Sequence, residues 1–223
     1  MHMTLEVCVD STASALAAKR GGADRLELCA DLIVGGTTPS AALVRQVKAE
    51  IGLPVRALLR PRFGDFCYDR YELAQMEALA AELVEAGADG IVTGALTPEG
   101  ELDVDALRPI YAAARRAAER TGRSVVCTLH RAFDVSRDPF AALAAAKELG
   151  LATILTSGQA ASAPEGAALL KQLVEAEGND IEILVGAGVN PGNLPALAAQ
   201  TGAKAFHLSG KKVCNSRMVF RRE

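Results

Sequence analysis

The chain has 223 residues, of which 50% are hydrophobic and 23% are charged, and its mean hydropathy is +0.17. This composition supports a sizeable buried core, and the length suits either one large domain or two small ones. The formal net charge of −3 gives no basic surface for a nucleic acid or an anionic membrane, and no apolar run approaches the roughly 18 residues of a membrane helix. Because the start of the chain also lacks a signal-peptide pattern, we expect a cytoplasmic protein.

Short runs rich in Val, Ile and Leu alternate along the chain with longer, alanine-rich segments of helical periodicity. In chain order, we predict eight strands at Leu5–Asp10, Arg25–Ala30, Val55–Pro61, Gly90–Leu96, Val125–Phe133, Thr153–Gly158, Ile181–Val189 and Lys204–Gly210. Polar, ionisable or glycine residues recur at the carboxyl ends of these runs. That regularity indicates that the strand ends form a common functional site.

Seven helices are predicted between the strands, from residues that typically start or stop a helix. They begin after Ser11, at Thr38-Pro39-Ser40, after Asp69, at Asp103, at Asp138-Pro139, at Pro164 and at Asn190-Pro191. Glycines end the first and the third to sixth of them, at Gly21-Gly22, Gly87, Gly122, Gly150 and Gly178. Glycine at these places suits a left-handed helix cap before the chain returns to the sheet.

Repeated strand–helix units with apolar strands predict a parallel sheet covered on both faces. Eight units favour a closed (β/α)8 TIM barrel, and an open doubly wound sheet is the alternative. No linker divides the series, so residues 1–210 are predicted to form a single domain. The tail, 211–223, has poor helical patterning, and the eighth helix is therefore missing or shortened. Either the barrel is left uncovered there, or a partner subunit or a further C-terminal segment covers it. We expect a homo-oligomer, most simply a dimer, or a shortened chain.

Two carboxylates and two thiols are predicted to meet inside the barrel. Glu6 and Cys8 lie two residues apart on the first strand, as Glu27 and Cys29 do on the second, so each pair shares one face. Buried carboxylates need cations, for which Arg60, Arg62 and Arg131 are the candidates. Alternatively, the glutamates pair with arginines only to hold the barrel together.

The thiols of Cys8 and Cys29 also suggest a metal site. Two thiolates can bind Cu(I), a soft ion, and a histidine can supplement them. The alternative is that each cysteine is simply a small buried hydrophobic side chain. The five cysteines are odd in number and scattered, which favours free thiols over a disulfide framework, and without a CxxC pair a structural zinc site has no support.

Two strand ends carry residues suited to acid–base chemistry on an anion. Arg60 in RPRFGDF can bind a carboxylate or phosphate, with Asp65 facing the same cleft, although a salt bridge within the loop is the alternative. His130 in TLHRAFD can act as a general acid or base that Asp134 orients, or it can be structural. His130 is in phase with Thr128, so it faces the lumen if Thr128 does. Arg131 then points to the helices unless the strand ends first.

A further group of residues resembles the anion-binding loops that follow the last strands of such barrels. Backbone N–H groups at glycines can hold an anion, although glycine in these turns is often required only by sterics. With the second arginine of RPRFGDF, the predicted anion-binding residues are Arg62, Ser157, Gly186, Gly188, Ser209 and Gly210.

At these segments the chain resembles the CutC family of copper homeostasis proteins. The matching motifs run nearly end to end: LEVCVDS, GGADRLELC, GGTTPS, RPRFGDFCY, DGIVTGAL, TLHRAFD, ILTSG, GAGV and FHLSG. The resemblance implies a cytoplasmic TIM barrel that handles copper, with Cu(I) ligated by Cys8 and Cys29. Phe63 stands where the family usually has a glycine, which would narrow the cleft, and the family's final helix has no counterpart here.

Two main functions remain open from the sequence. One is Cu(I) binding at Cys8 and Cys29. The other is an enzyme acting on a small carboxylate or phosphate by acid–base chemistry, because arginines are not what soft copper requires. Its predicted catalytic residues are Glu6, Glu27, Arg60, Asp65, His130 and Asp134. A barrel that acts only as an interaction scaffold is a third possibility.

Overall fold

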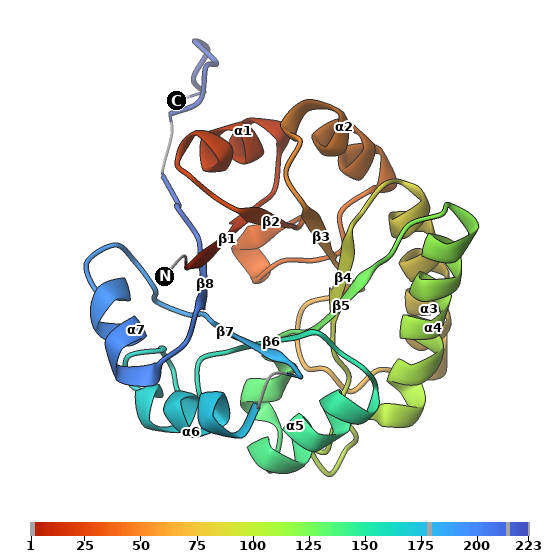
Figure 1. Ribbon diagram of the computed structural model, residues 1–223. Coiled ribbons are helices and arrows are strands. Elements are labelled where there is room, and N and C mark those ends of the chain that lie inside the picture. Colours follow the sequence, from red (N-terminus) through yellow and green to blue (C-terminus); the bar gives the residue numbers. More distant parts are fainter. Residues whose placement is uncertain (1–2, 178–179, 213–214, 223) are drawn as a thin grey trace.

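The computed structural model describes residues 3–177, 180–212 and 215–222. Eight parallel strands follow one another around a closed barrel in chain order, and helices form a ring outside it (Figure 1). The first and last strands complete the circle, with Thr4 opposite Ala205 and Val7 opposite Leu208. The predicted TIM barrel is therefore confirmed, and the open sheet is excluded.

The strands are shorter than the apolar runs that predicted them. They are β1 (Thr4–Val9), β2 (Arg25–Leu28), β3 (Val55–Leu58), β4 (Gly90–Thr93), β5 (Val126–Leu129), β6 (Thr153–Thr156), β7 (Glu182–Val185) and β8 (Ala205–Leu208). The difference is clearest after β5, where a 3-10 helix spans Arg131–Val135 and the predicted strand had continued to Phe133. The residues that end each apolar run thus belong to loops at the rim.

The helices begin largely where the polar caps predict. They are α1 (Thr12–Arg20), α2 (Ala41–Ile51), α3 (Arg70–Glu85), α4 (Val104–Arg120), α5 (Pro139–Glu148), α6 (Ala167–Glu177) and α7 (Leu194–Thr201). Ser11, Ser40, Asp69, Asp103 and Asp138 each accept a backbone N–H from the first turn of their helix. The predicted sixth stop, Gly178, lies outside the described residues. Within the described ranges, none of the helices is long and apolar enough to cross a membrane.

The last strand has no covering helix among residues 209–212 and 215–222. In Figure 1 the chain leaves the barrel after β8 and runs outward beyond α1. The ring between α7 and α1 is correspondingly open. This arrangement agrees with the prediction from the unpatterned tail, whose Cys214 lies outside the described residues.

Most of the apolar core lies between the strands and the helix ring. Strand side chains such as Leu26 and Ile91 pack there with helix side chains such as Val44 and Leu83, all of them almost fully buried. The barrel interior is different, because charged side chains occupy its amino-terminal half. The fold thus buries most of its apolar side chains outside the barrel and its main ion-pair network inside.

The interior charges form one connected network. Nε of Arg25 lies 2.6 Å from Oε2 of Glu6, and Nη2 of Arg25 lies 2.6 Å from Oε1 of Glu182. Arg56 lies 3.6 Å from Glu6 and donates hydrogen bonds to the hydroxyls of Thr128 and Thr153. Arg25 and Glu6 are neighbours on β2 and β1, whereas the contacts of Arg25 with Glu182 and of Arg56 with Thr128 and Thr153 join strands that are far apart in sequence.

Glu6 is ionised in spite of its position. Its side chain is only 1% exposed, and burial by itself would raise its pKa. A hydrogen bond with His207 and the charges of His207, Arg25 and Arg56 outweigh this effect and hold the pKa of Glu6 at about 2.

The prediction that Arg60, Arg62 and Arg131 neutralise the barrel glutamates is therefore wrong. Those arginines follow their strands and lie at the rim, whereas Glu6 lies within β1, at the level of Arg25. The alternative, in which glutamates and arginines pair to hold the barrel together, describes Glu6.

We expect Arg25→Met to destabilise the protein strongly. Removing one partner of a buried ion pair leaves the carboxylate of Glu6 uncompensated, which costs about 3–5 kcal/mol of unfolding free energy. Urea unfolding measures this directly. The matched control is Arg116→Met, since Arg116 and Glu77 form an exposed pair 3.5 Å apart, and its loss should cost about 0–1 kcal/mol. Equal losses in the two variants would contradict the role assigned to Arg25.

Candidate functional site

A cavity of about 800 Å³ opens at the carboxyl ends of the strands. One wall comes from β1, β2 and β8 and carries Cys8, Glu27, Cys29 and His207. The other comes from the segments after β3 and β5. This is the end of the barrel at which TIM-barrel proteins place their active sites.

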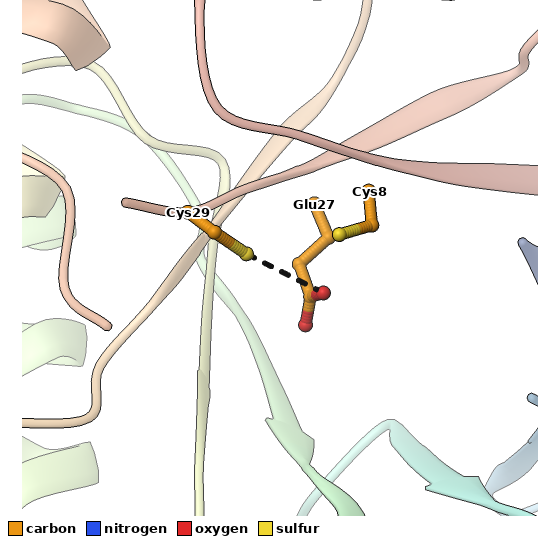
Figure 2. Close-up of side chains that lie close together, drawn as sticks. All are labelled: Cys8, Glu27 and Cys29. Atoms are coloured by element: carbon orange, nitrogen blue, oxygen red, sulfur yellow. Dashed lines mark hydrogen bonds between the residues drawn. The ribbon is translucent and has the colours of Figure 1, made fainter. Parts of the chain in front are cut away.

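The thiol wall is set by the pairing of β1 with β2. Cys8 lies opposite Glu27 in the register, and Cys29 follows two residues later on the same side. Figure 2 shows the three side chains converging, and ligand atoms of all three lie within 4.8 Å of one another. The Cys29 thiol donates to Oε2 of Glu27 at 3.6 Å. The structure thus brings together Cys8 and Cys29, as the sequence predicted.

His207 on β8 completes this wall, and the sequence interpretation missed it. Its Nδ1 lies 2.9 Å from Oε1 of Glu6, and its Nε2 lies 3.7 Å from Oε2 of Glu27. Burial by itself would lower the pKa of His207, but Glu27, Cys8 and Glu6 raise it well above the usual value. His207 is therefore a cation that joins the ion-pair network below to the thiols above.

The electrostatics of the thiol wall favour one thiolate. A hydrogen bond with Cys29 is the largest influence on Cys8 and, with help from His207, lowers its pKa to about 5 despite burial. The same hydrogen bond, together with burial, raises the pKa of Cys29 well above its usual value. Burial also raises the pKa of Glu27 to about 7. Cys8 thus favours the thiolate form at neutral pH, with Cys29 as its hydrogen-bond donor.

The opposite wall contains His130, Phe66 and Arg60. The His130 ring lies 4.7 Å from the Phe66 ring, and the Arg60 guanidinium lies 5.1 Å from the same ring. Because β5 ends at Leu129, both His130 and Arg131 line the cavity, so Arg131 does not turn toward the helices. Arg131 lies beyond the end of β5, so the alternation of side chains along a strand does not determine where it points.

Asp134 does not line the cavity, because it is fixed within the rim. Its carboxylate accepts hydrogen bonds from Nε of Arg131 at 2.7 Å and from Oγ1 of Thr156 at 2.5 Å. The backbone N–H and hydroxyl of Ser157 also donate to it, both at 3.0 Å. The donors after β6 that the sequence assigned to a ligand anion are thus occupied by a carboxylate of the protein itself.

Arg62 and Asp65 also lie away from the cavity lining. Arg62 binds Glu72 at 2.5 Å and Asp65 at 3.1 Å, which is the loop salt bridge considered as the alternative. Phe63 is 67% exposed and lies outside the lining as well, so it does not narrow the cleft.

The predicted glycine-rich loops divide into two groups. Gly188 and Ser209 line the cavity, whereas Gly186 and Gly210 do not. Gly186 has a steric reason for its identity, because a Cβ there would lie 2.6 Å from a methyl carbon of Leu155. No such contact applies to Gly210.

Comparison with known proteins identifies the group to which this barrel is related. The CutC family model matches residues 3–212, which is nearly the whole chain. The chain belongs to the CutC family.

Three CutC relatives are 32–43% identical to this chain over the aligned residues. A family protein CutC of Chromobacterium violaceum is 43% identical over 222 residues, covering 100% of this chain and 87% of the relative. The human protein named copper homeostasis protein cutC homolog is 42% identical over 217 residues, which cover 97% of this chain and 77% of the human protein. The crystal structure of a copper homeostasis protein CutC from Streptococcus agalactiae superimposes with a TM-score of 0.84 at 32% identity, covering 92% of this chain and 97% of that one.

We expect His130 to stay uncharged down to strongly acidic pH. Its burial, with the charge of Arg60 adding, lowers its pKa to about 3, whereas an unfolded histidine titrates near 6.5. Between these values only the unfolded chain takes up the proton, so His130 lowers stability as the pH falls, by about 2 kcal/mol at about pH 5.

His130→Asn should remove this acid sensitivity, since asparagine keeps a helix-capping oxygen and does not titrate. Urea unfolding of both proteins at about pH 7 and about pH 5 should show the variant gaining about 2 kcal/mol relative to wild type at the lower pH. An identical pH dependence in the two proteins would mean that His130 titrates normally.

Proposed function

We propose that this protein binds Cu(I) in copper homeostasis, with Cys8 and Cys29 as the ligands. The proposal rests on one observation, the convergence of two thiols and a carboxylate within 4.8 Å at the wall of an open cavity. It agrees with the names of the CutC relatives, which link them to copper homeostasis. The copper ion is cargo on this view, and no catalytic step is assigned to it.

The donor chemistry of this wall suits Cu(I) better than the harder metals. Thiolate sulfur is a soft ligand that selects Cu(I), and the ion accepts low coordination numbers. Cys8 supplies a thiolate at neutral pH because its pKa is about 5, and Cys29 must lose its proton when the ion binds. Glu27, a hard oxygen donor, accepts from Cys29 at 3.6 Å and is placed to receive that proton.

The surrounding residues also balance the charge of the copper–thiolate complex. Two thiolates and one Cu(I) carry a net charge of −1. The protonated His207 lies beside Cys8, with Glu6 on its far side at 2.9 Å. A fixed cation next to a buried anionic complex offsets the cost of removing that complex from water.

A Cu(I) competition titration against a chromophoric chelator, under anaerobic conditions, tests the proposal. We expect submicromolar binding of one ion per chain by wild type and loss of that binding in the double variant Cys8→Ser with Cys29→Ser. The loss should exceed the roughly 10- to 100-fold that follows when only a residue orienting a metal ligand is removed.

The matched control is Cys67→Ser, because Cys67 is an exposed thiol outside the cavity lining. It should bind copper as wild type does. If the double variant binds equally well, Cys8 and Cys29 are not the ligands. If Cys67→Ser loses the ion instead, copper binds at the surface.

Three other predictions from the sequence remain predictions. They are the cytoplasmic location, the homodimer and acid–base catalysis on a small anion. The last of these requires a place for the anion, and the second wall of the cavity is where its donors lie.

A further inference from the structure

We propose that the wall formed by Arg60, Phe66, His130 and Arg131 binds the carboxylate group of a small organic acid. This site is separate from the two thiols, although both open into the same cavity. It does not depend on copper binding. The argument comes from the hydrogen-bond donors that the fold leaves without acceptors on this side of the barrel mouth.

The protonation state of His130 follows from its hydrogen bonds. The backbone N–H of Ala132 donates to Nδ1 of His130 at 3.2 Å, so Nδ1 carries no proton. The neutral ring must then carry its proton on Nε2, which makes Nε2 a donor. Among the described residues Nε2 has no hydrogen-bond partner, although His130 is only 5% exposed.

Arg60 presents a second donor of the same kind. Its Nη1 donates to the carbonyl of Gly36 at 3.3 Å, and its Nη2 donates to the carbonyl of Gly64 at 2.8 Å. Its Nε is buried and finds no acceptor in the described part of the chain. Buried donors are nearly always paired in native proteins, so two unpaired donors on one wall point to an acceptor supplied from outside.

The two donors are held in place by a shared aromatic ring. Phe66 packs against the imidazole at 4.7 Å and against the guanidinium at 5.1 Å. Each donor offers one N–H, which matches the two oxygens of a carboxylate better than the three or more that a phosphate presents.

Charge and shape agree with a small acid. Arg60 and Arg131 give this side of the cavity its positive charge. Arg131 is held by Asp134 at 2.7 Å and by Ser157 at 3.1 Å, so it is positioned before any ligand arrives. Apolar side chains, among them Leu58, Leu155 and Val189, line other parts of the cavity and suit a short hydrocarbon body.

Isothermal titration calorimetry of the full chain with acetate, malonate, succinate and inorganic phosphate tests the proposal. We expect at least one carboxylate to bind more tightly than phosphate. Arg60→Met and His130→Asn should each weaken that binding roughly tenfold or more, because each removes a hydrogen bond to a charged group. Arg116→Met, an exposed arginine outside the cavity lining, should leave it unchanged.

A second measurement avoids the variants, since Arg60 also fastens two loop carbonyls. In wild-type protein, the Nε2–H proton resonance of His130, assigned by its absence from His130→Asn, should move downfield when the carboxylate binds. The double cysteine variant should bind the carboxylate as wild type does, which separates this site from the copper proposal.

Several results would overturn the proposal. They are no binding of any carboxylate, binding that survives both Arg60→Met and His130→Asn, tighter binding of phosphate, or a His130 signal that no probe moves. The last result would mean that water alone serves these donors.

Discussion

The buried carboxylate of Glu6 is the point on which the rest of this structure depends. It accepts from Arg25 on β2 and from His207 on β8, and Arg56 lies 3.6 Å away. A lone carboxylate at this depth would be neutral or would unfold the barrel, so each of these cations has a defined position because Glu6 is charged. The hydrogen bond with Cys29 is the main cause that lowers the thiol pKa of Cys8 to about 5, and the charge that Glu6 helps to keep on His207 adds to this effect. The chemistry of the rim therefore begins inside the barrel.

The two walls of the cavity differ in a way that separates their ligands. The thiol wall holds soft sulfur donors beside a carboxylate and a protonated histidine. The other wall holds a neutral histidine, with a pKa of about 3, and an arginine around one aromatic ring. The two histidines that line the cavity thus differ in charge: His207 is a cation and His130 is neutral. The cause is environment: His207 has carboxylates beside it, and His130 has Phe66 and Arg60.

The sequence predicted the barrel well because strand–helix alternation and capping residues are local signals. It also predicted the meeting of Cys8 with Cys29, since spacing by two on neighbouring strands requires only the parallel register. It missed His207 and Arg25, because their importance comes from the register that places both of them opposite Glu6, one on β8 and one on β2, and spacing within one strand does not give that register. A signal for His207 did exist, since it precedes Ser209 by two residues on the last strand. The position of Arg131 was left open for a different reason: alternation holds only while the strand lasts, and β5 stops at Leu129.

The carboxylate of Asp134 has a consequence for which ligands the rim can accept. It occupies the backbone and hydroxyl donors of Ser157 and is tethered to them by the chain, so it acts as an intramolecular competitor at high effective concentration. An incoming anion would have to displace it and leave Arg131 without its partner. The donors at the end of β6 are therefore already occupied by Asp134. Anion binding is left to the parts of the cavity on either side of β6.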